Sequence, residues 1–254
     1  MNIKTSKDRV LIIIPAYNEQ RNIFDVVSGV KKILPDVDVL VVDDGSRDNT
    51  RQLVLKSSCA VVSHVFNLGY GAALETGYLY AVRGGYNYVV QIDGDGQHPP
   101  EELPKFLESL KKNEADIVIG NRKGSDYSSS FFRKIGQRLF SYLIYLLSGF
   151  RSGDSTSGFQ GLNYKAFSLF AKGGFPHDYP DADVILMSQF AGLRIKEIPV
   201  RMLIRKRGVS MHSGIKPLYY VIKMFLSMFI VCLNKRSLHK LTDEPAVSDE
   251  ACRL

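Results

Sequence analysis

Apolar and polar positions come in alternating blocks along the first 120 residues of the chain. Short apolar runs are typical of buried strands, and they are separated by longer segments in which apolar residues recur every three or four positions, as on one face of a helix. In the first such segment the recurring residues are Ile23, Val26, Val27, Val30 and Leu34. The pattern predicts strands at residues 10–15, 37–42, 60–65, 88–92 and 117–120, and helices at residues 19–34, 47–56, 71–82 and 101–112.

This alternation of strands and helices predicts an α/β fold. Strands joined by helices of this length form a mostly parallel sheet with helices on both faces, as in Rossmann-like folds. Ligands of such sheets bind beyond the carboxyl ends of the strands. Polar clusters lie at three of these ends, and we expect them to meet at one edge of the sheet: residues 15–19, 43–46 and 93–97. Ser46 is the expected N-cap of the helix that follows it.

The pattern changes after Gly120. It predicts a polar loop, an apolar helix with basic residues near its start, a second loop, a helix and a strand, at residues 125–130, 131–150, 154–158, 182–191 and 194–200. A basic segment and an apolar stretch follow, at residues 201–216 and 218–233. We expect one domain rather than two over residues 1–212, then a separate helix over 213–236 and a flexible tail over 237–254.

Composition and charge narrow the class of protein. The chain has 254 residues, of which 45% are hydrophobic, and this is enough for a full core. Its net charge is +7, and the segment 201–216 contains basic residues but no acid. Such a surplus suits nucleic acid, anionic lipid or phosphorylated substrates. Because no helix-turn-helix, zinc-finger or RNP signature is present, we expect no nucleic-acid partner.

The cysteines and the N-terminus bear on the compartment. Cys59, Cys232 and Cys252 are too few and too scattered for a zinc site or a disulfide framework, which favours a reducing environment. Residues 1–9 are polar and run directly into the first strand, so we expect no signal peptide.

The strand at residues 88–92 ends on two aspartates, Asp93 and Asp95, each followed by a glycine. Alternate residues of a strand point the same way, and glycine lets a ligand approach the backbone closely. Two hard carboxylates form half of the coordination shell of Mg²⁺ or Mn²⁺, and substrate phosphates and water can supply the rest. The alternative is a solvated Asp-Gly turn. The sequence therefore predicts a divalent-cation site here, provided that the surrounding motifs agree.

Seven motifs occur in an order that resembles the inverting family 2 glycosyltransferases of GT-A fold. The closest branch is similar to the polyprenyl-phosphate hexose synthases, of the dolichyl-phosphate mannose synthase type. The resemblance covers roughly residues 9–212. It is carried by Ile14-Pro-Ala-Tyr-Asn-Glu19, Val41-Val-Asp-Asp-Gly-Ser46, Asn67-Leu-Gly-Tyr-Gly71, Gln91-Ile-Asp-Gly-Asp-Gly-Gln-His-Pro99, Gly120-Asn-Arg122, Ser155-Thr-Ser-Gly-Phe159, and Glu197-Ile-Pro-Val200 followed by Arg205, Gly208 and Ser210.

The resemblance implies a site for a nucleotide sugar and a divalent cation, Mg²⁺ or Mn²⁺. Asp95 and Gln97 match the metal-binding positions, and Asp93 lies beside them at the sugar and diphosphate as a further metal candidate. The cation would stabilise the departing diphosphate as a Lewis acid. The other donor-binding residues that it implies are Pro15, Ala16, Tyr17 and Glu19 around the base, Asp43 and Asp44 at the base and ribose, and Asn67 and Gly71.

Two of these motifs have simpler alternatives. Asp43 and Asp44 can accept hydrogen bonds from base N–H and ribose hydroxyl groups, but the same sequence also suits a turn and a helix cap. The glycine-rich segment 67–73 could be a phosphate-binding loop at a helix N-terminus. Because it lacks G-x-G-x-x-G spacing, we expect it to close over the nucleotide by backbone contacts.

The acceptor side of the site separates the possible branches. Asp183 lies fourteen residues before Glu197, as the acidic residue of the synthase branch does, and it would be the general base for a sugar hydroxyl. Asp181 makes that assignment ambiguous. A lipid phosphate is already an anion and needs cations instead. The residues that the resemblance assigns to it are Arg122, Arg133, Arg138, Arg205 and Ser210.

Two departures from the branch pattern bear on this assignment. Met211 stands where the branch usually has a lysine, directly after the serine of R-x-x-G-x-S. The Q-x-x-R-W motif of processive polysaccharide synthases is absent, which argues against polymerisation.

Membrane attachment is the last expectation. The apolar stretch 218–233 is interrupted by Lys223 and is shorter than the roughly 20 residues that a spanning helix needs. We expect it to lie in the membrane interface, together with residues 131–150, on the anionic cytoplasmic leaflet. The alternative is that both are core helices or contacts to a second copy or a small membrane protein.

The sequence thus predicts a hexosyltransferase that uses a UDP- or GDP-sugar and polyprenyl phosphate, at the cytoplasmic face of the membrane, in cell-envelope polysaccharide biosynthesis. Two rivals remain open. One is a transferase that extends a lipid-linked oligosaccharide or a surface polysaccharide, with Asp183 as base. The other is a non-catalytic scaffold that holds a membrane partner.

Overall fold

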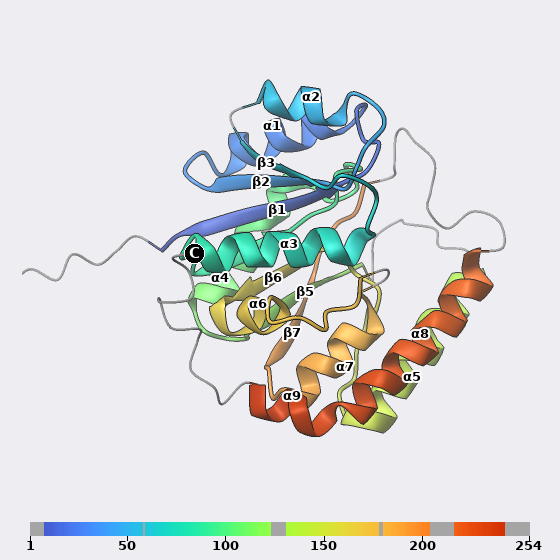
Figure 1. The fold of residues 1–254 in the computed structure, drawn as a ribbon. Coiled ribbons are helices and arrows are strands. Elements are labelled where there is room, and N and C mark those ends of the chain that lie inside the picture. Colours follow the sequence, from blue (N-terminus) through green and yellow to red (C-terminus); the bar gives the residue numbers. More distant parts are fainter. Residues whose placement is uncertain (1–7, 58, 123–130, 178–179, 204–215, 242–254) are drawn as a thin grey trace, which may run out of the picture.

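The computed structural model describes residues 8–57, 59–122, 131–177, 180–203 and 216–241. Within these residues seven strands form one sheet, in the order β3-β2-β1-β4-β6-β5-β7 (Figure 1). All pairs are parallel except those of β6, which runs antiparallel to both β4 and β5. The strands are β1 (Val10–Ala16), β2 (Asp38–Asp43), β3 (Ala60–Ser63), β4 (Tyr88–Gln91), β5 (Ile117–Asn121), β6 (Gln160–Asn163) and β7 (Ile195–Pro199).

Helices cover both faces of the sheet. One face carries α1 (Ile23–Ile33), α2 (Thr50–Leu55), the 3-10 turn η1 (Pro100–Glu102) and α4 (Leu103–Lys111). The other face carries α3 (Tyr70–Arg83), α6 (Tyr164–Phe170) and α7 (Ala182–Phe190). The remaining helices are α5 (Phe131–Ser148), α8 (Lys216–Leu233) and α9 (Lys235–Leu241).

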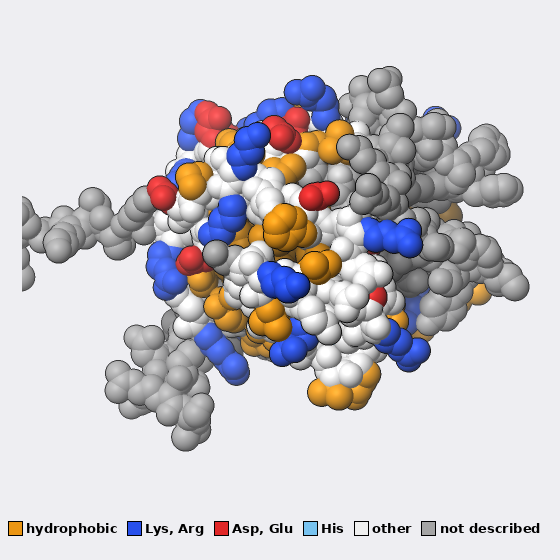
Figure 2. Space-filling view, turned by 90° about the horizontal axis from the view of Figure 1, so that it is seen from above, with side chains coloured by type: hydrophobic (Ala, Val, Ile, Leu, Met, Phe, Trp, Pro, Cys, Tyr) orange, Lys and Arg blue, Asp and Glu red, His pale blue; other side chains and the backbone are white. Residues whose placement is uncertain are grey.

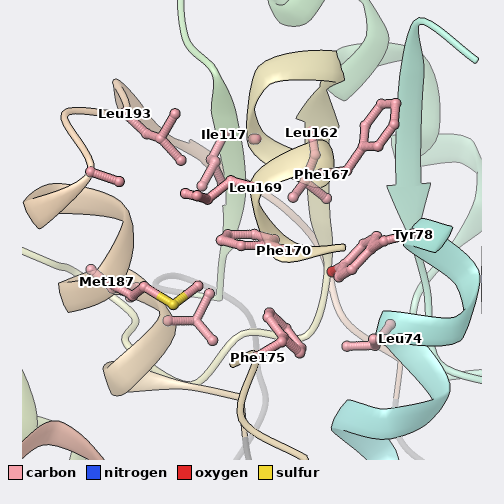
Figure 3. Close-up of a cluster of buried hydrophobic side chains, with 14 of the residues drawn as sticks. Leu74, Tyr78, Ile117, Leu162, Phe167, Leu169, Phe170, Phe175, Met187 and Leu193 are labelled. Carbon is pink, nitrogen blue, oxygen red and sulfur yellow. The ribbon is translucent and has the colours of Figure 1, made fainter. Parts of the chain in front are cut away.

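Two hydrophobic cores lie on the two faces of the sheet. Leu11 and Ile13 of β1 point into one core, and Ile12 and Ile14 point into the other. Because both faces are covered, the strand is apolar throughout rather than alternating. The first core contains a ring cluster in which Tyr78, Phe170 and Phe175 have centroids 5.1–5.7 Å apart (Figure 3). This cluster fixes α6 and the segment after it against α3.

The predicted α/β fold with a mostly parallel sheet is confirmed, and two local predictions were wrong. Helix α2 begins at Thr50 with Asn49 as its N-cap, so Ser46 is not the cap. Ser46 instead accepts a hydrogen bond from the backbone N–H of Asn18, 2.9 Å away. Strand β6 was not predicted, because its four residues include a single bulky apolar side chain, Leu162. Helix α6 was also not predicted.

Helices α5 and α8 lie side by side at one end of the molecule (Figure 1). They meet where the rings of Phe140 and Phe225 have centroids 5.6 Å apart. Within the described part of the chain, none of the helices combines the length and apolarity needed to cross a membrane. Helix α9 extends to Leu241, into the expected tail, and residues 242–254 lie outside the described residues.

The face over α1 and α2 has a mixed charge. Lys and Arg side chains are interspersed there with Asp and Glu and do not gather into one patch (Figure 2). The described side chains on this face therefore form no continuous basic stripe.

Candidate functional site

The predicted clusters do meet at one edge of the sheet. Ala16 at the end of β1 pairs with Asp43 at the end of β2, and β4, which ends just before Asp93, pairs with the other side of β1. The antiparallel strand β6 begins at this same edge, since Gln160 pairs with Gln91. Its direction brings the loop 154–158, which overlaps the quoted motif Ser155–Phe159, to the site, although strand β6 itself was not predicted.

The loops after β1 and β2 interlock. The Arg47 N–H donates to Asn18 Oδ1 at 2.8 Å, and the Glu19 N–H donates to Thr50 Oγ1 at 2.8 Å. Asn18 takes a left-handed conformation with φ 56°, which asparagine adopts more readily than most residues. Pro15 and Ala16 are buried at the strand end, whereas the Tyr17 side chain is 40% exposed. Tyr17 is thus the accessible aromatic ring of this loop.

Asp43 and Asp44 are both buried. Asp43 Oδ1 accepts a hydrogen bond from the Ser46 N–H at 3.2 Å. Asp44 accepts the N–H of Leu68 at 2.8 Å on Oδ1 and the N–H of Gly69 at 3.0 Å on Oδ2. Its Oδ1 also lies 2.7 Å from the Nδ1 of His64. Both oxygens of Asp44 are therefore engaged in holding the loop 67–71.

That loop leads into α3, whose first N–H groups are satisfied inside the protein. The carbonyl oxygen of His177 accepts the N–H groups of Gly71 at 2.6 Å and Ala72 at 3.2 Å. A Cβ on Gly71 would lie 1.9 Å from the carbonyl oxygen of Pro176, so only glycine fits there. Asn67 is exposed at the start of the loop. This geometry disfavours phosphate binding at the α3 N-terminus and gives Gly71 a packing role.

Asp93 is held between two neutral side chains. The Tyr70 hydroxyl donates to Asp93 Oδ1 at 2.7 Å. His98 Nδ1 accepts the N–H of Asp93 at 2.9 Å, and its Nε2 lies 3.7 Å from Asp93 Oδ2. The His98 ring is buried and stacks on Phe159 at 4.7 Å, and this burial lowers the pKa of His98 to about 4. His98 is therefore neutral at physiological pH, with its proton on Nε2.

The predicted metal residues share one loop. Asp95 Oδ1 accepts the Gln97 N–H at 2.9 Å, and Gly96 makes the turn with φ 78°. Gln97 also exchanges hydrogen bonds with Leu203: its carbonyl oxygen accepts the Leu203 N–H at 2.9 Å, and its Nε2 donates to the Leu203 carbonyl at 3.4 Å. Carboxylate and amide oxygens suit a hard divalent cation. No three His, Cys, Asp or Glu side chains among the described residues form a metal cluster, so substrate oxygens would have to complete the shell.

Arg122 is neutralised by a buried partner. Its guanidinium donates to the two carboxylate oxygens of Asp154 at 2.6 and 2.7 Å and to the carbonyl oxygen of Thr156 at 2.8 Å. Burial raises the pKa of Asp154, but the hydrogen bonds and charge of Arg122 outweigh it and leave that pKa below its ordinary value. The pair ties the loop 154–158 to the end of β5.

Asp183 lies at the start of α7 and is 1% exposed. Its Oδ1 accepts the N–H groups of Asp181 at 3.0 Å and Val184 at 2.8 Å, and its Oδ2 accepts the Ser227 hydroxyl. Burial raises the pKa of Asp183 to about 7. The side chain faces a groove of about 180 Å³ whose lining also includes Pro176, His177, Lys223, Met224, Leu226, Ser227 and Ile230.

Of the other expected acceptor residues, only Arg138 has its side chain among the described residues. Arg138 is exposed on α5. Arg133 lies in α5, but its side chain is outside the described part of the chain, as are the whole of Arg205 and Ser210. The residues that the sequence analysis missed are Tyr70, His98, Asp154 and Gly158. Tyr70, His98 and Gly158 stood inside quoted motifs, yet their closeness to Asp93 depends on the fold.

The chain resembles known proteins over most of its length. The model of the family described as Glycosyl transferase family 2 matches residues 11–170. An undecaprenyl-phosphate mannosyltransferase of Micrococcus luteus is 32% identical over 223 residues, which cover 81% of this chain and 88% of that protein. A polyprenol monophosphomannose synthase of Mycolicibacterium smegmatis is 32% identical over 219 residues, which cover 81% of this chain and 82% of that protein.

Solved structures share the fold. A glucosyl-3-phosphoglycerate synthase of Mycobacterium tuberculosis, crystallised with Mn²⁺, UDP and glucosyl-3-phosphoglycerate, superposes with a TM-score of 0.69. The match covers 89% of this chain and 80% of that chain, at 18% identity. At this identity the likeness establishes the GT-A fold alone.

Proposed function

Because the chain belongs to glycosyl transferase family 2, we propose that this glycosyltransferase moves one hexose from a UDP- or GDP-sugar to polyprenyl phosphate. The observation that carries the proposal is the single loop that holds Asp93, Asp95 and Gln97 beside the ends of β1 and β2. The two relatives named above, a mannosyltransferase and a synthase of the polyprenyl-phosphate branch, support the acceptor.

On the donor side, Asp95 and Gln97 would hold a divalent cation, with Asp93 next to them at the sugar and diphosphate. When bound, the cation supplies Lewis-acid stabilisation of the departing diphosphate. Tyr17 would cover the base, Asp43 would contact base or ribose, and Pro15, Ala16, Glu19 and Asn67 would line the pocket. The complex of Mn²⁺ and UDP on the same fold supports this kind of donor.

In the transfer step an oxygen of the lipid phosphate attacks the anomeric carbon while the bond from that carbon to the diphosphate breaks. The attack is in line, so the configuration inverts and the product is a β-linked polyprenyl-phosphate sugar. No proton has to be removed, because the phosphate is an anion. Its charge would be matched by Arg133, Arg138 and Arg205, with Ser210 as a further donor. Arg122 would act through the loop 154–158, since Asp154 already neutralises it.

Helices α5 and α8 support a peripheral place on the membrane, which we assign to the cytoplasmic leaflet. Both expose large apolar side chains, and Lys235 and Arg236 begin α9, one residue after the end of α8. A basic end beside an apolar face is typical of a helix that lies in the membrane interface. The exposed residues are Leu139, Tyr142, Tyr145, Leu146 and Leu147 of α5, and Ile222, Phe225, Leu226, Phe229, Ile230 and Leu233 of α8.

The main rival keeps the donor site and changes the acceptor to a lipid-linked oligosaccharide. A raised pKa suits a general base, and that of Asp183 is about 7. Both oxygens of Asp183, however, already accept hydrogen bonds from the protein. The substitution D183N distinguishes the two: it would abolish turnover but not donor binding for a sugar acceptor, and it would leave transfer to a phosphate largely intact.

The test is a radiolabel transfer assay with membranes, Mg²⁺ or Mn²⁺, and a panel of UDP- and GDP-hexoses. We expect label in a chloroform-soluble, acid-labile product that carries one sugar, and the active donor identifies the nucleotide. Label that appears only on a preformed glycolipid, or in an acid-stable product, would support the rival enzyme that extends a lipid-linked oligosaccharide. Absence of transfer from every donor would favour the scaffold.

A further inference from the structure

We propose that Tyr70 is a positioning residue that sets the orientation of the Asp93 carboxylate and thereby the affinity of the site for a nucleotide sugar. The Tyr70 hydroxyl donates to Asp93 Oδ1 at 2.7 Å across 23 residues of sequence. The inference rests on the proposed function in one respect, namely that Asp93 contacts the donor.

The position of Tyr70 is set by the loop that carries it. Asp44 holds the loop through the N–H groups of Leu68 and Gly69, and Gly69 has φ 107°, a conformation that favours glycine. On the other side of Tyr70, the Gly71 N–H donates to the carbonyl oxygen of His177. The loop is thus anchored both before and after Tyr70. It connects the carboxylate at the end of β2 to the one that follows β4.

The Tyr70 hydroxyl, like the Tyr70 backbone, has little room to move. A Cβ on Gly158 would lie 2.8 Å from the Tyr70 hydroxyl oxygen and 3.3 Å from Asp93 Oδ1. The loop 154–158 therefore closes over the hydrogen bond and keeps the hydroxyl directed at Asp93. On the opposite side, His98 Nε2 lies 3.7 Å from Asp93 Oδ2. The Tyr70 hydroxyl is therefore within hydrogen-bonding distance of one carboxylate oxygen, and the His98 ring lies near the other.

The chemistry of the pair suits orientation rather than charge neutralisation. A phenol is neutral at physiological pH, so the Tyr70 hydroxyl is a neutral donor to Asp93 Oδ1. A phenol holds one carboxylate oxygen without cancelling the charge, which stays available to the hydroxyl groups of the donor sugar. Sites whose groups are held in the productive orientation before binding lose less free energy when the ligand arrives.

The experiment compares Y70F with Y86F in the full chain. Tyr86 donates to Asp38 Oδ2 at 2.9 Å, near the amino end of β2, so Y86F removes a bond of the same kind remote from the site. Calorimetry with Mn²⁺ measures binding of UDP-glucose, GDP-mannose, UDP and GDP. We expect Y70F to weaken binding of the preferred nucleotide sugar about tenfold and binding of its free nucleoside diphosphate less than twofold. Y86F should bind both ligands like the wild type.

A second variant tests the same contact from the other side. In G158A the new methyl displaces the Tyr70 hydroxyl, and we expect the loss seen in Y70F. In Y70F/G158A the Tyr70 hydroxyl, which is the atom nearest to the new methyl, is absent. The double variant should therefore bind the nucleotide sugar no worse than Y70F alone, because the effects of substitutions at contacting residues are not additive. Additive losses would overturn the inference.

The remaining outcomes are distinct. Wild-type affinity in Y70F, or an equal loss for nucleotide sugar and free diphosphate, would overturn the positioning role. One outcome is that Y70F weakens binding of the nucleotide sugar but not of the free diphosphate, while the transfer assay shows no sugar on polyprenyl phosphate. In that case the inference stands and the proposed acceptor is wrong. If the wild type binds no nucleotide sugar, both fail.

Discussion

The hydroxyl of Ser227 on α8 donates a hydrogen bond to the buried carboxylate of Asp183 at the start of α7. The two residues are 44 positions apart, and the bond ties α8 to the body of the molecule. Burial of the Asp183 carboxyl raises its pKa to about 7. The bond to Ser227 and two backbone N–H groups favour the ionised form, but they do not offset the loss of water.

The ionisation of Asp183 should therefore make the protein less stable as pH rises. The unfolded carboxyl ionises near its ordinary pKa of 3.8, whereas the folded one ionises at about 7. Between these values the folded state binds a proton that the unfolded state has lost, so the free energy of unfolding decreases as pH rises and levels off above about 7. D183N resembles the protonated acid and lacks this dependence. Urea unfolding at pH 5 and pH 8 should show the wild type losing stability relative to D183N.

Asp116 provides the control for that measurement. Burial raises its pKa, but hydrogen bonds from Arg194 outweigh it, and the pKa lies below the ordinary value. Asp116 is ionised in both states from pH 5 to pH 8, so the difference between D116N and the wild type should stay constant. A constant difference for D183N as well would contradict the buried-acid assignment.

The Arg122–Asp154 pair should behave as one structural unit. Alanine at either position leaves a buried charge without its partner, and we expect each of R122A and D154A to cost about 3–5 kcal/mol of unfolding free energy. The double variant should cost much less than the sum, with a coupling above about 1 kcal/mol in denaturant titrations. Additive costs would indicate that Arg122 acts independently of Asp154, for example on an acceptor.

Removal of the cation or of one carboxylate should have the same effect. D95N removes the negative charge from one ligand in the loop 93–97 and leaves a neutral amide oxygen that binds a divalent cation more weakly, so Mn²⁺ should no longer enhance UDP or GDP binding in calorimetry. EDTA should reduce the wild type to the level of D95N. D25N makes the same change of charge at an exposed position on α1 and should keep the enhancement. If Mn²⁺ still enhanced nucleotide binding fully in D95N, the metal site would have to lie elsewhere.

The apolar face of α5 and α8 should bind lipid. Phe229 on α8 is 59% exposed, and F229E places a charge in that face. We expect it to lose co-sedimentation with vesicles of phosphatidylglycerol and phosphatidylcholine. F24E is the matched control, because Phe24 is 52% exposed on α1, and it should sediment like the wild type. If F229E instead changes the oligomeric state and leaves sedimentation intact, the face contacts a second copy.

The local pattern of apolar and polar residues was enough to predict most of the strands and helices. The period of the apolar residues identified the strands and helices up to Gly120, and their alternation implied a parallel sheet with its polar clusters at the carboxyl ends. That inference works because burial on both faces imposes apolar strands, and because parallel pairing places the carboxyl ends of neighbouring strands at the same edge. It failed for β6, whose few apolar positions carry no period, and at Ser46, where a contact with Asn18 replaced a cap.

The sequence by itself determined which residue types stand at the strand ends, and with them the family and the candidate donor site. Only the tertiary structure decided how those residues are used. It brought Tyr70 and Gly158 to Asp93, neutralised Arg122 with Asp154, and joined Gln97 to Leu203 across 106 residues. The physical reason is that a periodic pattern reports burial of one element at a time. A hydrogen bond between distant side chains depends on the packing of several elements against one another, which no local pattern encodes.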